Sequence, residues 1–293
     1  MNSITSRGEK IFSAINVILL AVFGLICAYP IYYIIMGSIS NPMEMMKHMG
    51  ILIKPYGFSL AAYQTVLENR MIPLGYLNTL FYLAVGLAVN MTFTSLGAYA
   101  LSKKSMALRN PIMLMVSFTM FFSGGMIPTY LVVQELGMVD SWTAMVFPSA
   151  INTFNLIIMR TSFQELPEEL FESVRIDGGN EWQIFFRIAL PLSPAVLAVI
   201  ALYYGVYHWN SWMPAMLYMR TRENYPLQLV LREILINNDL SSMGGSASDG
   251  DQEYISATLK YATIIVATVP IMCVYPFLQK YFMKGVMVGA IKG

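Results

Sequence analysis

One short segment of this chain is unusually rich in charged residues. Of the 18 basic and 17 acidic residues, nine lie between positions 160 and 187. Pro167 suits the first turn of a helix, and the glycines at 178–179 suit its end, because glycine readily adopts the left-handed conformation that closes a helix. Asn180 can cap a second short helix, with Gln183 as its capping-box partner. The segment therefore predicts two short, capped helices joined by a tight turn.

The first of these helices would be amphipathic. Leu170, Phe171 and Val174 fall on one face, whereas the charged residues point elsewhere. This pattern favours a helix lying on the surface of the protein. A solvated connecting loop is the alternative, and the residues alone leave both readings open.

Catalytic constellations are missing from the sequence. It contains no G-x-x-x-x-G-K-[ST] phosphate loop and no cluster of residues at metal-ligand spacing. Cys27 and Cys273 lie in apolar runs, which is typical of small buried hydrophobic residues. His208 is the only ionisable residue in the long apolar runs, which argues against transport driven by protons or sodium ions. We expect the energy for any work to come from another subunit.

The composition identifies the elements that must position these residues. Charged residues make up 12% of the 293 residues, against about 25% in soluble proteins, and hydrophobic residues make up 56%. These values exclude an ordinary soluble enzyme, and the net charge of +1 gives no field for a nucleic acid. The sequence predicts an all-α integral membrane protein with six transmembrane helices. The expected spans are 11–36, 76–101, 111–133, 142–159, 194–215 and 261–279.

Lysine and arginine predict the orientation of these spans. With six spans, both termini share one side, and that side receives eleven basic residues against seven on the other. Both termini and the 160–191 loop are therefore expected in the cytoplasm, and the 221–259 loop outside.

The 165–191 segment resembles the EAA loop of ABC importer permeases, E-A-A-x3-G-x9-I-x-L-P. It reads Glu172-Ser173-Val174, three residues, Gly178, nine residues, and Ile188-Ala189-Leu190-Pro191. The spacing fits throughout, although serine and valine replace the two alanines.

Other segments are similar to maltose-type carbohydrate permeases, and some to a branch that handles complex or acidic oligosaccharides from pectin or alginate. They are Gly97–Ser102, Ser123–Tyr130, Trp209–Trp212 and Lys284–Gly293. The resemblance covers nearly the whole chain.

The resemblance implies a type I ABC importer fold with a cytoplasmic coupling helix that docks in a cleft of an ATPase. Leu170, Phe171 and Val174 would be its apolar anchors, and Glu172 would meet a basic residue. The residues implied in coupling are Leu170, Phe171, Glu172, Ser173, Val174, Asp177, Gly178, Ile188, Leu190 and Pro191.

The resemblance also implies a set of partners. Residues 1–293 would form a single permease domain in a bacterial inner membrane, paired with a second, homologous permease in a heterodimer. A homodimeric ABC ATPase would bind ATP and magnesium, and an extracytoplasmic solute-binding protein would deliver the sugar. This chain would bind no cofactor, metal or nucleic acid and would not be an enzyme. The alternative is a self-contained membrane channel or facilitator for small solutes.

Aromatic rings and amides at helical spacing are the candidates for a sugar path, because sugars present apolar faces and hydroxyl groups. They are Asn152, Asn155, Tyr203, Tyr204, Tyr207, His208 and Asn210. The alternatives are an interfacial aromatic belt and hydrogen bonds between helices.

Two further contacts are expected from the loop and the tail. An amphipathic helix follows Pro226, either packed on the bundle or facing the binding protein, which residues 237–254 could reach. The tail through Gly293 would touch the ATPase or remain solvated.

Overall fold

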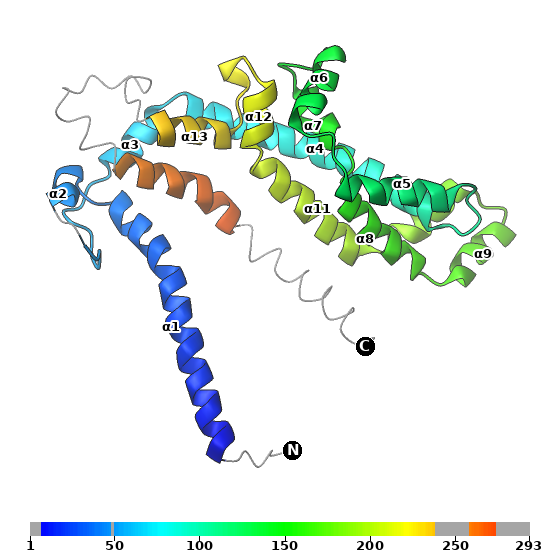
Figure 1. Cartoon of the computed structure of the whole chain (residues 1–293), viewed down its shortest axis with the longest axis horizontal. Helices are drawn as coiled ribbons and strands as arrows, with labels where there is room; N and C mark the ends of the chain where they lie inside the picture. Colours follow the sequence, from blue (N-terminus) through cyan, green and yellow to red (C-terminus); the bar gives the residue numbers. More distant parts are fainter. Residues whose placement is uncertain (1–6, 48–49, 238–257, 274–293) are drawn as a thin grey trace. The chain divides into compact units, whose positions relative to one another are not determined.

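The computed structural model describes residues 7–47, 50–237 and 258–273, which are mostly helical (Figure 1). In these ranges the only β-type pairing is an isolated bridge between Ser40 and Phe58. The chain forms two compact units. One comprises residues 1–70 and 233–269, and the other comprises residues 71–232 and 270–293.

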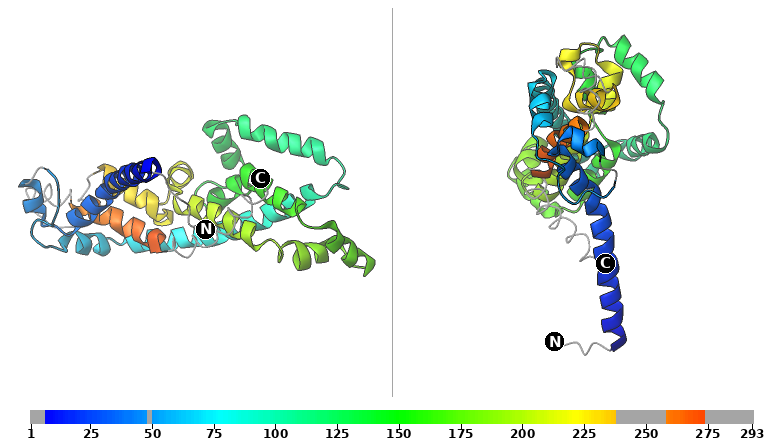
Figure 2. Two further views of the ribbon diagram at one scale, coloured as in Figure 1. Left: turned by 90° about the horizontal axis from the view of Figure 1, so that it is seen from below. Right: turned by 90° about the vertical axis from the view of Figure 1, so that its left-hand side faces the viewer.

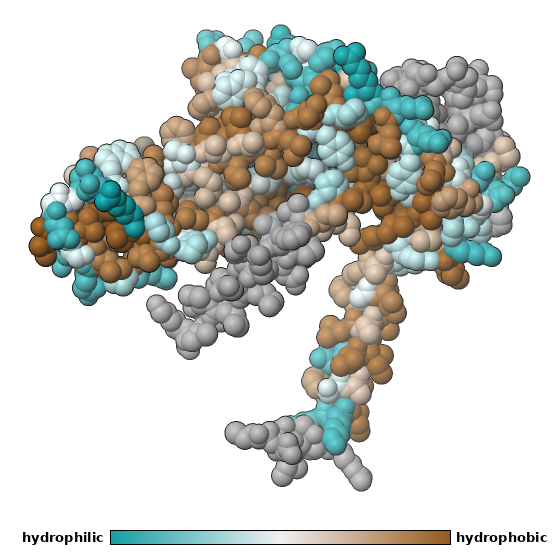
Figure 3. Space-filling view, turned by 180° about the vertical axis from the view of Figure 1, so that it is seen from behind, coloured by the Kyte–Doolittle hydropathy of each residue, from teal (hydrophilic) through white to brown (hydrophobic). Residues whose placement is uncertain are grey.

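In the described part of the first unit, one helix is long enough to cross a membrane. The unit comprises α1 (Arg7–Ser38), α2 (Pro42–Lys47), α3 (Ala61–Glu68) and most of an apolar helix at Thr258–Cys273. The apolar side chains of α1 are exposed along most of its length, and Figure 3 shows the resulting hydrophobic surface. A long apolar helix with an exposed surface is suited to contact with lipid.

The second unit is built around α4 (Met71–Ser102), which packs against α8 and α11. Its other helices are α5 (Arg109–Phe121), α6 (Met126–Glu135), α7 (Trp142–Val146), η1 (Phe147–Ser149), α8 (Thr153–Gln164), α9 (Glu168–Ile176), α10 (Glu181–Ile184), η2 (Phe185–Ala189), α11 (Pro194–Trp209), α12 (Trp212–Tyr218), η3 (Arg222–Asn224) and the start of α13 (Leu227–Asn237). The buried positions of α4 are mostly small or polar, including Gly75, Thr79, Gly86, Asn90, Thr94 and Ala98. Such residues let membrane helices approach closely and bond to one another.

Several expected spans differ from the observed helices. The 111–133 run consists of two helices, α5 and α6. The chain bends by 118° between them, and this bend can be followed in Figure 2. The 142–159 run is bent by 53° between Ser149 and Thr153. The first break contains Gly125 with φ of +86°, a conformation that glycine adopts at little cost. A charge-free run predicts apolar surroundings but does not predict that the helix is continuous.

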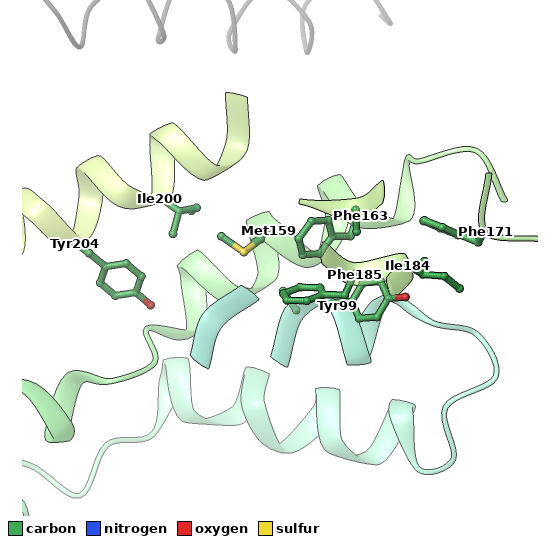
Figure 4. Close-up of a cluster of buried hydrophobic side chains, with 10 residues drawn as sticks. Tyr99, Met159, Phe163, Phe171, Ile184, Phe185, Ile200 and Tyr204 are labelled. Carbon is green, nitrogen blue, oxygen red and sulfur yellow. The ribbon is translucent and has the colours of Figure 1, made fainter. Parts of the chain in front are cut away.

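A hydrophobic cluster joins the end of α4 to α8, α9, η2 and α11 (Figure 4). Its larger members are Tyr99, Met159, Phe163, Phe171, Ile184, Phe185, Ile200 and Tyr204. The ring of Tyr99 lies against those of Phe163 and Phe185, with centroids 6.1 and 5.1 Å away. The cluster therefore fixes the charged segment to the helices of the second unit.

Candidate functional sites

The end of α9 has the hydrogen bonds of a Schellman motif. Pro167 precedes the helix, as the sequence predicts within one residue. The Gly178 N–H donates to the Arg175 carbonyl at 3.0 Å, and the Gly179 N–H donates to the Val174 carbonyl at 2.8 Å. Gly178 has φ of +78°, so the predicted glycine stop is confirmed.

The second predicted cap is also confirmed. The Asn180 side chain accepts from the Gln183 N–H at 2.9 Å, and the Gln183 side chain accepts from the Asn180 N–H at 3.0 Å. This reciprocal pair starts α10 directly after the turn.

Gly179→Ala is expected to destabilise this turn. A β-carbon at Gly179 would lie 2.4 Å from Val174 Cγ1 and 2.8 Å from the Val174 carbonyl oxygen. Overpacking of this kind costs about 1–3 kcal/mol, so the loop should be cleaved faster by added protease. Gly205→Ala is the matched control, because a β-carbon there meets nothing within 4 Å. Equal protease resistance of the two variants would contradict the prediction.

The apolar face of α9 packs on this chain itself. Phe171 is 7% exposed inside the hydrophobic cluster, and Val174 packs against the same cluster. Phe171 is therefore covered by the chain itself, whereas Val174 is only half-buried. Leu170 is 37% exposed at the edge of this face, whereas Ile176 is 85% exposed.

The opposite face of α9 is open. It consists of Glu169, Glu172, Ser173 and Ile176, which are spaced as neighbours on one side of a helix and are all exposed. In the described part of the chain, Glu172 has no ion-pair partner within 4.0 Å.

The remaining predicted coupling residues lie around the turn and along the next helices. Asp177 is the exposed C-cap of α9. Ile188 and Leu190 are partly buried against the hydrophobic cluster, and Pro191 is exposed.

Glu181 connects α9 and α10 to the end of α4. Its Oε2 accepts from the Tyr99 hydroxyl at 2.7 Å and lies 3.5 Å from Lys103 Nζ. Its Oε1 accepts from Arg175 at 2.8 Å. Burial raises the pKa of Glu181, but the bonds from Tyr99 and Arg175 and the charge of Lys103 outweigh burial and hold the pKa below its usual value. This network could not be predicted from the residues alone, because Tyr99 lies 82 positions from Glu181.

Glu181→Gln is expected to loosen the junction by about 1 kcal/mol, since the carboxylate is half exposed. A carboxyl group with a lowered folded pKa gives its full contribution above the ordinary value of about 4.3, and loses it as the pH falls through the lower folded value. The wild-type protein should therefore keep the same protease resistance of the 160–191 segment from pH 8 to pH 5. The variant should be cleaved faster over this whole range. A loss in the wild type between pH 7 and pH 5 would contradict the role of Glu181.

A cavity of about 580 Å³ opens beside this junction, and we call it the Lys103 cavity. It is lined by Ser102, Lys103, Lys104, Ser105, Phe163, Gln164, Leu166, Glu168, Phe171, Arg175 and Glu181. It therefore lies between the end of α4 and the root of α9.

A second cavity, of about 380 Å³, lies between α8 and α11, and we call it the aromatic cavity. It is lined by Ser149, Asn152, Phe154, Asn155, Tyr203, Tyr204 and Tyr207. Five of the seven predicted path residues therefore lie together. Ser149 and Phe154 were not predicted, although Phe154 could have been found from its place between Asn152 and Asn155.

The other two predicted path residues do not line this cavity. Asn210 is exposed, and its amide donates to the Val206 carbonyl at 3.0 Å. His208 is fully buried, and its Nε2 lies 2.7 Å from Asn90 Oδ1. The Asn90 amide donates to the carbonyls of Ser149 and Ala150, so its oxygen accepts and His208 Nε2 carries the proton.

The start of the helix after Pro226 packs within the second unit, which supports one of its two predicted roles. Leu227, Val230 and Leu231 are buried, and the Leu227 N–H donates to Thr79 Oγ1 at 2.8 Å. The predicted contacts of residues 238–254 and of the tail 284–293 lie outside the described residues. Over the described ranges, no three His, Cys, Asp or Glu side chains are grouped to hold a metal ion.

Comparisons with known proteins identify the family of the chain. Residues 93–288 match the family model described as "Binding-protein-dependent transport system inner membrane component". The polygalacturonan/rhamnogalacturonan transport system permease protein YtcP of Bacillus subtilis is 43% identical over 290 residues, which cover 97% of this chain and 99% of the relative. Protein LplC of the same organism is 42% identical over 98% of this chain and 97% of its own.

A solved structure has the same fold. It is a chain of a bacterial ABC transporter involved in the import of the acidic polysaccharide alginate. The TM-score is 0.88 at 33% identity, over 96% of this chain and 100% of that chain. Its similarity assigns an all-helical ABC importer permease fold to this chain.

These matches extend over almost the full length of the relatives. A membrane component of such a system works with a binding protein and an ATPase, so ATP hydrolysis resides on another subunit. The chain belongs to the inner-membrane components of binding-protein-dependent transport systems, and it is the permease subunit of an ABC importer.

Proposed function

We propose that this permease translocates acidic oligosaccharides derived from pectin or alginate. The relatives named for polygalacturonan and for alginate support this substrate class. The observation that carries the proposal is the aromatic cavity, in which three tyrosines and Phe154 stand beside Asn152 and Asn155. Aromatic rings suit the apolar faces of sugars, and amides suit their hydroxyl groups.

The carboxylates of the substrate would be recognised elsewhere. None of the described residues that line the aromatic cavity is basic. The second permease subunit or the binding protein would then provide the cations that select an acidic sugar.

The helices of the chain are consistent with six spans in a single permease domain. Among the described residues, two helices are long and apolar enough to cross a membrane, or up to five if each of three bent pairs counts as one span, and the shorter apolar helix Thr258–Cys273 would be the sixth. With both termini in the cytoplasm, α9 and the 160–191 loop face the ATPase, and the 221–259 loop faces the binding protein.

Coupling would use the open face of α9. Glu172 would pair with a basic residue of the ATPase, and Ile176 would be the apolar anchor in place of Phe171 and Val174. The full importer would contain this chain, a second homologous permease, a homodimeric ATPase that binds ATP and magnesium, and a solute-binding protein.

Reconstitution in proteoliposomes tests this function. We expect uptake of oligogalacturonate or oligoalginate only when the ATPase, ATP and the binding protein are all present. Flux through this chain alone, without the ATPase, would instead favour a self-contained channel.

Tyr207→Ala is expected to lower saccharide uptake about fivefold to tenfold, because it removes an aromatic surface from the aromatic cavity. Uptake at saturating binding protein is the measurement. Phe121→Ala removes an exposed ring that lines no part of this cavity and serves as the control. Equal uptake by both variants would remove the aromatic cavity from the path.

A further inference from the structure

The Lys103 cavity has no role in translocation as described above, yet its lining suits a ligand. We propose that it binds a small acidic saccharide, a uronate, on the cytoplasmic side, where this ligand regulates coupling. The proposal rests on the proposed function, because the transported substrate would supply uronates to the cytoplasm.

The cations of the cavity are only partly neutralised. Lys103 is 15% exposed, and its Nζ has no hydrogen-bond partner but lies over the rings of Phe171 and Tyr99, 3.9 and 4.5 Å from their centroids. Its nearest carboxylate oxygen, on Glu181, is 3.5 Å away and already accepts from Tyr99. Within the described ranges, Lys104 has no ion-pair partner at 4.0 Å or less.

The neutral lining suits the rest of a sugar. Ser102 and Ser105 present hydroxyl groups and Gln164 presents an amide, whereas the ring of Phe171 is buried beneath the Lys103 ammonium group. The acidic members are Glu181, which is engaged with cations, and the exposed Glu168. A ligand with one carboxylate and several hydroxyl groups therefore matches the cavity better than a multiply charged anion.

The position of the cavity connects occupancy to coupling. Its walls come from the end of α4, the turn that follows it, α8 and α9. A ligand that touches both α4 and α9 binds the conformation described here more tightly than a conformation in which the two helices have moved apart. Such a ligand opposes any movement of α9 away from α4. We infer that accumulated product slows its own import.

Calorimetric titration of galacturonate into the assembled permease–ATPase complex in nanodiscs, without binding protein, tests the site. We expect binding of galacturonate but not of galactose, which lacks the carboxylate. Lys104→Gln should weaken binding about tenfold, the typical effect of losing one charged hydrogen bond. Ser105→Ala, the second variant, removes one hydroxyl group from the lining and should also weaken binding. Lys54→Gln, the same change at an exposed lysine that does not line the cavity, should leave binding unchanged.

The outcomes separate this site from the translocation path. Binding that Tyr207→Ala abolishes and Lys104→Gln preserves would place the ligand in the aromatic cavity and overturn the proposal. Equal binding of inorganic phosphate, or no binding of galacturonate, would also overturn it. Bound galacturonate should lower ATP hydrolysis in the wild type but not in Lys104→Gln, and unchanged hydrolysis would refute the regulatory role. Failure of the importer to carry acidic saccharides would appear separately, in the uptake assay.

Discussion

Glu172→Lys is expected to abolish saccharide uptake while ATP hydrolysis continues. Glu172 is exposed on the open face of α9, so the change leaves the packing of Phe171 and Val174 intact. A lysine at this position would face the basic residue that we propose in the ATPase cleft. Like charges placed together at an interface cost several kcal/mol. We expect uptake in proteoliposomes to fall at least about thirtyfold, since each 1.4 kcal/mol is a factor of ten.

Glu165→Lys is the matched control, because it makes the same charge change at an exposed position before α9. This variant should transport like the wild type, and both should show the wild-type unfolding temperature. Wild-type uptake by Glu172→Lys would refute the role of α9 in coupling. Loss of uptake in both variants would attribute the effect to net charge and not to the α9 face.

The caps of the charged segment could be predicted because they are local. A Schellman turn and a capping box depend on residues within one or two turns, so Gly178, Asn180 and Gln183 are sufficient to indicate them. The motif spacing then identified the family before any tertiary contact was known.

The orientation of α9 could not be predicted in the same way. An amphipathic pattern identifies an apolar face but not the surface that covers it. Phe171 looked suitable for a partner, yet the cluster around Tyr99 and Phe185 buries it. The Glu181 network was missed for a related reason, since Tyr99 lies 82 positions away.

Helical spacing predicted the aromatic cavity only in part. Tyr203 and Tyr207 share one face of α11 and line the aromatic cavity, as does Tyr204. Tyr204 and His208 share another face, which meets α4. There the Tyr204 hydroxyl lies 2.7 Å from Thr94 Oγ1, and His208 bonds to Asn90. Nothing in the spacing indicates that a glycine of α4 makes room for the histidine.

Gly86→Ala is therefore expected to separate α4 from α11. A β-carbon at Gly86 would lie 2.3 Å from His208 Nε2 and 2.4 Å from its Cε1. The imidazole would have to move and lose its bond to Asn90, which holds the carbonyls of Ser149 and Ala150 beside the aromatic cavity. Overpacking costs about 1–3 kcal/mol and an unpaired buried polar group about 1–3 kcal/mol more. We expect a lower unfolding temperature and reduced uptake, whereas Gly205→Ala should change neither.

A double-mutant cycle identifies the cause. If the β-carbon acts by displacing the imidazole, His208→Ala should remove the clash, and Gly86→Ala should cost little in that background. The two substitutions should then destabilise less together than the sum of their separate effects, by about 1 kcal/mol or more. Additive effects would show that Gly86 matters for a reason other than its contact with His208. Partial return of uptake in the double variant would assign the loss in Gly86→Ala to the displaced ring. In that case, the buried histidine serves the path by holding Asn90 and the 149–150 backbone in place, without touching the substrate.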